Sequence, residues 1–277
     1  MPVIRLGLIG DNIAASQAPD LHHAAARLCG IDVTYVRMVP RDLGLSFDDV
    51  VTRAQQDGWR GLNITYPYKE RVLKFVRIDD EGVLAIRACN TVLFGEPPVG
   101  QNTDYTGYVA AFQNRFGTMK PGVVAVAGSG GAGKAVAFAL ATLGAKSLAL
   151  FDTDAGKSYA LAAALRQHQS GMAVRVASSL QDACEGADGL INCTPIGMVG
   201  HDGDPFDGIE LRSRSWICDV VYTPLETTFL KRGRAAGAEI LSGYELFLYQ
   251  GIHAFKLFTG RDVGHAELRR ALEGKAD

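Results

Sequence analysis

The chain has 277 residues, which makes two domains a better expectation than one and leaves room for a large core. Its charges nearly cancel, at a net −2, and the lysines and arginines are scattered, so a nucleic-acid partner is not expected. No apolar run reaches the roughly eighteen residues that a membrane span needs, and the N-terminus lacks a secretory pattern. We therefore expect a soluble, cytoplasmic protein, with no membrane partner, that acts on a small molecule.

The cysteines and histidines indicate neither cross-links nor a metal. The five cysteines, Cys29, Cys89, Cys184, Cys193 and Cys218, are odd in number and form no CxxC pair. Buried free thiols are therefore a simpler expectation than a disulfide framework or a structural zinc site. The six histidines show no metal-ligand spacing on a common element, so no metal site is predicted.

From the start to about residue 240, short apolar runs alternate with helical patterns, as in βαβ units built on a parallel sheet. In the first module, strands are predicted at 3–9 and 33–39 and helices at 19–29 and 46–56. Two polar runs with turn signals follow, at 61–69 and 102–104, and hold Lys69 and Asp104. We interpret these two residues as a proton-transfer pair. The alternative is an exposed lysine and an aspartate that caps a helix predicted at 104–116.

A second module begins near residue 121, where an apolar strand at 123–127 runs into a glycine-rich turn. The turn reads GxGxxG, with Gly128, Gly130 and Gly133, and leads into a predicted helix. This context is typical of dinucleotide sites, because glycines let the backbone approach a pyrophosphate at the helix N-terminus. An ordinary glycine-rich turn is the alternative. Further strands are predicted at 147–152, 172–176, 189–192, 216–221 and 239–241.

Asp152 ends the next predicted strand, 19 residues after Gly133. A carboxylate at that place accepts hydrogen bonds from the adenine ribose hydroxyls and repels a 2′-phosphate. No arginine or lysine follows before Lys157, so the pattern favours NAD over NADP. Asp154 competes for the role, and Asp152 has the alternative interpretation of a turn former.

Two later strands end in turn-rich segments, 192–198 and 219–224. A nicotinamide site is expected at such carboxyl ends of strands, and ordinary strand exits are the alternative. After about residue 243 the chain is predicted to be helical, at 246–259 and 266–273, and these helices are expected to return to the first module. The predicted domains are therefore 1–106 with 243–277, and 107–242.

The chain resembles the shikimate/quinate dehydrogenase family over nearly its whole length. The matching runs are 61–69, 89–92, 101–104, 128–133, 192–198, 219–224 and 243–250. The resemblance implies an α/β substrate-binding domain, a doubly wound Rossmann domain and reversible oxidation of shikimate to 3-dehydroshikimate, with quinate as a further substrate. It also implies that Lys69 and Asp104 are the catalytic pair, and that the substrate is contacted by Ser16, Asn63, Thr65, Asn90, Tyr222 and Gln250.

The expected cofactor is NAD, with NADP less favoured, and the expected assembly is a monomer or homodimer. The family's basic run after the second Rossmann strand is missing here, which agrees with Asp152. The residues expected to bind the cofactor are Gly128, Gly130, Gly131, Ala132, Gly133, Asp152, Asn192, Thr194, Pro195, Val220 and Gly243.

The N-terminal loop departs from the family, which presents two hydroxyl residues, two apart, just before a proline. Ser16 matches the first of them, and Ala18 stands at the second. In the family these hydroxyls hold the substrate carboxylate, so one hydrogen bond is missing unless another residue or water replaces it. We expect weaker shikimate binding, or a related polyol acid or amino analogue as the substrate. A non-catalytic NAD-binding regulator is a third hypothesis, which the intact Lys69 and Asp104 disfavour.

Overall fold

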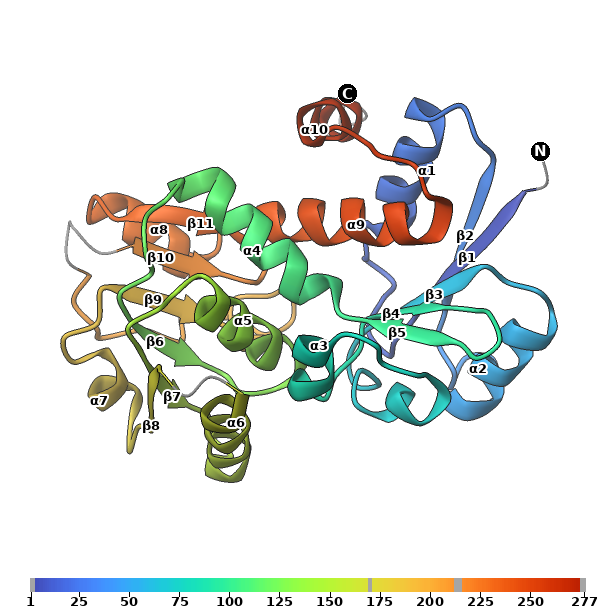
Figure 1. The fold of residues 1–277 in the computed structure, drawn as a ribbon. Coiled ribbons are helices and arrows are strands. Elements are labelled where there is room, and N and C mark those ends of the chain that lie inside the picture. Colours follow the sequence, from blue (N-terminus) through green and yellow to red (C-terminus); the bar gives the residue numbers. More distant parts are fainter. Residues whose placement is uncertain (1–2, 169–170, 212–215, 275–277) are drawn as a thin grey trace. The chain divides into compact units, whose positions relative to one another are not determined.

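The computed structural model describes residues 3–168, 171–211 and 216–274 (Figure 1). The chain forms two compact units, Met1–Thr103 with Leu248–Asp277, and Asp104–Phe247. Each unit contains its own β-sheet, and helices cover the faces of each sheet. The α/β fold class predicted from the sequence is confirmed.

The sheet of the first unit has the strand order β2-β1-β3-β4-β5. Its members are β1 (Ile4–Ile9), β2 (Val33–Met38), β3 (Gly61–Ile64), β4 (Thr91–Leu93) and β5 (Val99–Gln101). The pair β1–β2 is parallel, as predicted, and β1–β3 is parallel as well, although no strand was predicted at 61–64. The pairs β3–β4 and β4–β5 are antiparallel. The sequence did not predict this antiparallel part, because strands of three or four residues are too short to show a period.

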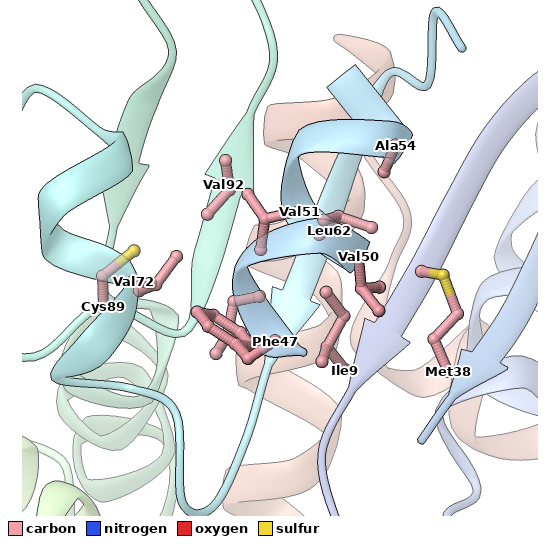
Figure 2. Packing of buried hydrophobic residues seen from close by; sticks show 11 residues of the cluster. Ile9, Met38, Phe47, Val50, Val51, Ala54, Leu62, Val72, Cys89 and Val92 are labelled. Atoms are coloured by element: carbon pink, nitrogen blue, oxygen red, sulfur yellow. The ribbon is translucent and has the colours of Figure 1, made fainter. Parts of the chain in front are cut away.

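The helices of the first unit pack on both faces of this sheet. They are α1 (Ala18–Leu28), α2 (Phe47–Gln56), the 3-10 helix η1 (Arg71–Phe75), α3 (Glu81–Ile86), α10 (His265–Glu273) and the later part of α9 (Gly243–Thr259). The helix α2 begins with a capping box, in which Ser46 Oγ accepts from Asp49 N at 3.1 Å and Asp49 Oδ2 accepts from Ser46 N at 3.2 Å. Its apolar side chains pack against β1 and β3 (Figure 2); they are Phe47, Val50, Val51 and Ala54.

The opposite face of the same sheet is covered by α9. Leu6 and Leu8 of β1 share a buried cluster with Ala254 and Phe258 of α9. A Cβ atom at Gly61 would lie 2.5 Å from the Phe258 ring, so the helix packs directly on β3. The C-terminal helices therefore return to the first unit, as predicted.

Within the described residues, the second unit has a sheet of six strands in the order β11-β10-β9-β6-β7-β8, all paired in parallel. The strands are β6 (Val123–Ala127), β7 (Ser147–Phe151), β8 (Ala173–Val176), β9 (Gly189–Asn192), β10 (Trp216–Asp219) and β11 (Glu239–Ser242). The helices are α4 (Thr103–Phe116), α5 (Gly131–Thr142), α6 (Ala155–His168), α7 (Leu180–Cys184) and α8 (Thr228–Ala235). Read from β8, the order is that of a doubly wound dinucleotide-binding sheet, which confirms the Rossmann prediction.

The strand order reverses between β6 and β9, and ligands of such sheets bind at the carboxyl ends of strands at this point. Here β6 ends just before Gly128 and β9 ends at Asn192. The two segments predicted to bind a cofactor therefore meet at the switch point. Among the residues described, no helix is both long enough and apolar enough to cross a membrane.

Candidate active site

The glycine turn after β6 has the geometry of a pyrophosphate site. Gly128 has φ +96°, and a Cβ atom at Gly133 would lie 2.1 Å from the Gly128 carbonyl oxygen. A Cβ atom at Gly130 would meet no heavy atom of the described residues within 4 Å, so the approach to the turn is open there. The helix α5 starts with Gly131 and Ala132, and within the described chain no side chain caps its N-terminus. Its first amide groups are therefore suited to an anion.

Asp152 is held against this turn by two backbone amides. Its Oδ2 accepts from Ser129 N at 2.7 Å, and its Oδ1 accepts from Asp154 N at 2.9 Å. Asp154 accepts instead from Gly156 N at 3.0 Å and lies 3.9 Å from Lys157 Nζ. The structure thus brings Asp152, and not Asp154, to the glycine turn, while Asp152 also forms the turn that the alternative interpretation expected.

Asn192 organises the loop that leaves β9. Its Nδ2 donates to Ile196 O and to Asp219 Oδ1, both at 2.9 Å. Its Oδ1 accepts from Thr194 N at 2.9 Å and from Thr194 Oγ1 at 2.7 Å. Because the amide is fully buried and used inside the chain, Asn192 shapes the loop that presents Thr194 and the exposed Pro195.

Asp219 is the carboxylate beneath this loop, and the sequence analysis did not single it out. It also accepts from Val221 N at 3.0 Å and from Thr227 Oγ1 at 2.7 Å. Burial raises the pKa of Asp219 to about 6, against the lowering effect of hydrogen bonds from Thr227, Val221 and Asn192, and nearby Asp204 adds to the rise. The sequence did contain one indication of this role, because Asp219 is a charged residue at the end of an otherwise apolar strand.

Three further predicted residues lie together where β10 ends. Val220 N donates to Asn192 O at 3.0 Å, next to the loop just described. A Cβ atom at Gly243 would lie 2.6 Å from Val220 O, so the start of α9 touches this strand exit. The Tyr222 ring stacks on Phe247 with centroids 4.7 Å apart.

In the first unit, the loops after β1 and β3 are tied together. Thr65 N donates to Ile9 O at 2.9 Å, and Asp11 N donates to Tyr66 O at 3.2 Å. Tyr68 donates from its hydroxyl to Asp11 Oδ1 at 2.6 Å. Burial and the bond to Asp11 raise the pKa of Tyr68 to about 12, so the phenol stays neutral. These contacts fix the loop that carries Thr65 and ends at Lys69.

Asn90 connects the segment of Lys69 to the residue before Asp104. Cys89 N donates to Lys69 O at 2.8 Å. The buried Asn90 side chain accepts from Thr103 N at 2.7 Å and donates to Thr103 Oγ1 at 3.0 Å. Lys69 and Asp104 are both half-buried. The two predicted catalytic residues therefore adjoin one hydrogen-bonded cluster around Asn90.

Asn63 is buried, at 7% exposure, next to the still less exposed Asn90. Its Oδ1 accepts from Tyr35 Oη at 2.9 Å, and its Nδ2 donates to Asn90 O at 3.3 Å and to Thr91 Oγ1 at 3.1 Å. Its amide thus holds the Asn90 backbone through a hydrogen bond. A contact of Asn63 with the substrate stays a prediction.

His22 is buried next to Tyr35, which belongs to the hydrogen-bonded network of Asn63. Its ring stacks on Tyr35 with centroids 4.5 Å apart, and its Nδ1 has no hydrogen-bond partner among the described residues. Burial lowers the pKa of His22 to about 3, against the raising effect of a hydrogen bond with Asn63 and with a small lowering effect of His23. The imidazole is therefore neutral at physiological pH.

The remaining predicted substrate residues are Ser16 and Gln250. Ser16 is half-buried, and its Oγ accepts from Ala18 N at 3.3 Å. Gln250 lies on α9 in the first unit and is also half-buried. Across the described ranges, no cluster of three His, Cys, Asp or Glu residues has the geometry to hold a metal ion.

Comparison with known proteins gives consistent matches over both units. Residues 8–92 match the family model described as the shikimate dehydrogenase substrate binding domain. The chain is 38% identical over 273 residues to the quinate/shikimate dehydrogenase (NAD(+)) of Corynebacterium efficiens, with 96% of each chain covered. The chain belongs to the shikimate/quinate dehydrogenase family.

Other members of the shikimate/quinate dehydrogenase family extend the comparison. The quinate dehydrogenase of Corynebacterium glutamicum, solved in complex with NAD, is 34% identical and superposes with a TM-score of 0.89 over 98% of this chain and 99% of that one. The shikimate dehydrogenase (NADP(+)) of an Arthrobacter species is 36% identical over 270 residues, covering 95% of this chain and 92% of the relative. Because these family members are named for different cofactors, the choice of cofactor has to be argued from residues of this chain.

Proposed function

We propose that the protein oxidises shikimate reversibly to 3-dehydroshikimate with NAD, and that it also accepts quinate. The observation that carries the proposal is the Asn90 cluster, which adjoins Lys69 and Asp104 in a chain that matches a quinate/shikimate dehydrogenase over 96% of its length. A purely regulatory NAD-binding protein has no use for such a proton-transfer pair.

The chemistry requires a base that takes a proton from the alcohol oxygen while a hydride leaves the carbon. NAD, when bound, supplies the hydride acceptor at the nicotinamide ring. In the proposed mechanism Lys69 Nζ takes the hydroxyl proton during oxidation and returns it to the oxygen during reduction. A lysine side chain is normally protonated at neutral pH, which suits the reductive direction. The Asp104 carboxylate accepts a hydrogen bond from this amine and so orients it toward the alcohol oxygen.

The cofactor preference rests on Asp152. Its carboxylate accepts hydrogen bonds from Ser129 N and Asp154 N at the glycine turn. In the proposed complex it also accepts hydrogen bonds from the ribose hydroxyls. A 2′-phosphate at that place meets like charge, and the nearby Lys157 lies beside Asp154. The open Gly130 and the uncapped start of α5 fit the pyrophosphate. We therefore propose NAD rather than NADP.

The substrate hydroxyls are assigned to polar side chains of the first unit. Thr65, Asn90 and Gln250 supply donors and acceptors, and Ser16 is assigned to the carboxylate. The role of Tyr222, which belongs to the second unit, stays a prediction. Ala18 supplies no hydroxyl, which keeps a related polyol acid or an amino analogue as an alternative substrate.

The direct test follows NADH or NADPH formation with shikimate, quinate and an amino analogue, each offered with NAD and with NADP. We expect turnover with shikimate and a kcat/KM at least about 10-fold higher with NAD, since one repelled charge is worth about 1.4 kcal/mol or more. A preference for NADP would contradict the role of Asp152. Absence of turnover with every substrate would contradict the proposed reaction.

A further inference from the structure

Arg37 lies level with residues of the proposed substrate site. In the register of the three parallel strands, Arg37 of β2 is opposite Leu8 of β1, and Leu8 is opposite Asn63 of β3. Residues in register on parallel strands point to the same face of a sheet. Tyr35, two residues before Arg37, points to this face as well and bonds to Asn63. The Arg37 side chain therefore rises from the same face and at the same level as Asn63.

The guanidinium of Arg37 reaches the loop that carries Ser16. Its Nη2 donates to the Ser16 carbonyl oxygen, and Ser16 Oγ in turn accepts from Ala18 N at 3.3 Å. Arg37 thus contacts the loop that holds both positions where the family presents hydroxyl groups to a carboxylate, which are Ser16 and Ala18 here.

The charge of Arg37 is available for a ligand. The side chain is exposed, and no carboxylate of the described residues forms an ion pair with it. A guanidinium has five N–H donors in a planar fork, and the contact with Ser16 uses the Nη2 end alone. The remaining donors suit a bidentate contact with a carboxylate.

We propose that Arg37 binds the carboxylate of the substrate and replaces the contact that a hydroxyl at position 18 would make. The inference rests on the proposed function and specifies it further. It makes an anionic cyclic polyol the preferred substrate class, and it makes a neutral polyol a poor one.

Two variants separate the charge of Arg37 from its contact with the loop. Arg37→Gln keeps an N–H donor for the Ser16 carbonyl and removes the charge, whereas Arg37→Lys keeps the charge and loses the fork. Arg5→Gln is the matched control, because Arg5 also donates to a backbone carbonyl, that of Asp57 at 2.9 Å, from the other end of the sheet. The KM of shikimate and the inhibition constant of its uncharged methyl ester are measured with saturating NAD.

We expect Arg37→Gln to raise the KM of shikimate by about 10- to 100-fold, the range of a charge-assisted hydrogen bond. The inhibition constant of the ester and the KM of NAD stay within about twofold, Arg37→Lys has a smaller effect, and Arg5→Gln has none. With the unmodified protein, the KM of shikimate rises between low and high salt while the constant of the ester does not. This salt comparison uses the unmodified protein, so it remains valid even if a variant fails to fold.

Three results would overturn the inference. An unchanged KM of shikimate in folded Arg37→Gln is the first. The second is an equal change in the KM of shikimate and in the inhibition constant of its ester, because Arg37 would then only hold the loop in place. The third is a flat salt dependence of the unmodified protein. Failure of the unmodified protein to turn over shikimate or quinate would instead overturn the proposed function, and this inference with it.

Discussion

Asn192 donates a hydrogen bond of 2.9 Å to Asp219 where β9 and β10 end side by side. Both side chains are fully buried. Asn192 shapes the loop with Thr194, and Asp219 holds Val221 and Thr227. The two loops assigned to the nicotinamide are therefore organised around one buried carboxylate.

Asp219→Asn is expected to change how stability depends on pH. The pKa of Asp219 is raised from 3.8 to about 6, so between these values the native state binds a proton that the unfolded chain has released. The free energy of unfolding therefore falls as pH rises through this window, by about 3 kcal/mol from this group. The asparagine variant keeps an acceptor for Asn192 and Val221 and lacks this fall. Urea unfolding at pH steps from 4 to 7 measures it, and parallel curves for the two proteins would contradict the prediction.

His22→Phe is expected to act with the opposite sign. The pKa of His22 is lowered from 6.5 to about 3, so below pH 6.5 the unfolded chain gains a proton that the native state does not bind. Stability from this group is complete above pH 6.5 and is lost on acidification, at up to about 1.4 kcal/mol per pH unit. Phenylalanine keeps a ring against Tyr35 and does not titrate. Its acid unfolding is expected to be shallower, and the same steepness in both proteins would refute this.

Asp152→Asn tests the cofactor assignment, with Asp154→Asn as the matched control two residues away. Removal of the charge at 152 is expected to lower the ratio of kcat/KM for NAD over NADP by about 10-fold or more, because the repulsion of the 2′-phosphate disappears. The control is expected to change the ratio by less than about twofold. If both variants shift the ratio equally, Asp152 has no special role.

Ala18→Ser restores the second hydroxyl of the N-terminal loop. A new hydrogen bond to a carboxylate is expected to lower the KM of shikimate by up to about 10-fold. The gain is expected to be larger in Arg37→Gln, where the carboxylate has lost its other partner. Steady-state kinetics of the two single variants and the double variant measure this coupling. An unchanged KM in both backgrounds would show that the carboxylate lies elsewhere.

Much of the fold was predictable because long, periodic segments carry their own signal. The strand at 123–127 and its glycine turn were predicted with their observed bounds. The strands β4 and β5 were not predicted, since each has three residues and depends on pairing with distant neighbours. The proposed site divides in the same way. Lys69 and the glycines belong to local sequence motifs, so they could be identified from the sequence. The roles of Arg37 and Asp219 could be inferred only after strand register and burial were known.

The most direct test of the proposed reaction compares Lys69→Ala with Lys74→Ala. Lys74 is an exposed neighbour that pairs with Asp48, so it controls for the loss of a lysine near this loop. Shikimate oxidation is measured with saturating NAD, and NAD binding is measured separately by fluorescence. Lys69→Ala is expected to lower kcat by about 100- to 10,000-fold, with NAD affinity nearly intact, because a positioned acid-base group is lost. Turnover that remains at the level of Lys74→Ala would contradict Lys69 as the proton-transfer group.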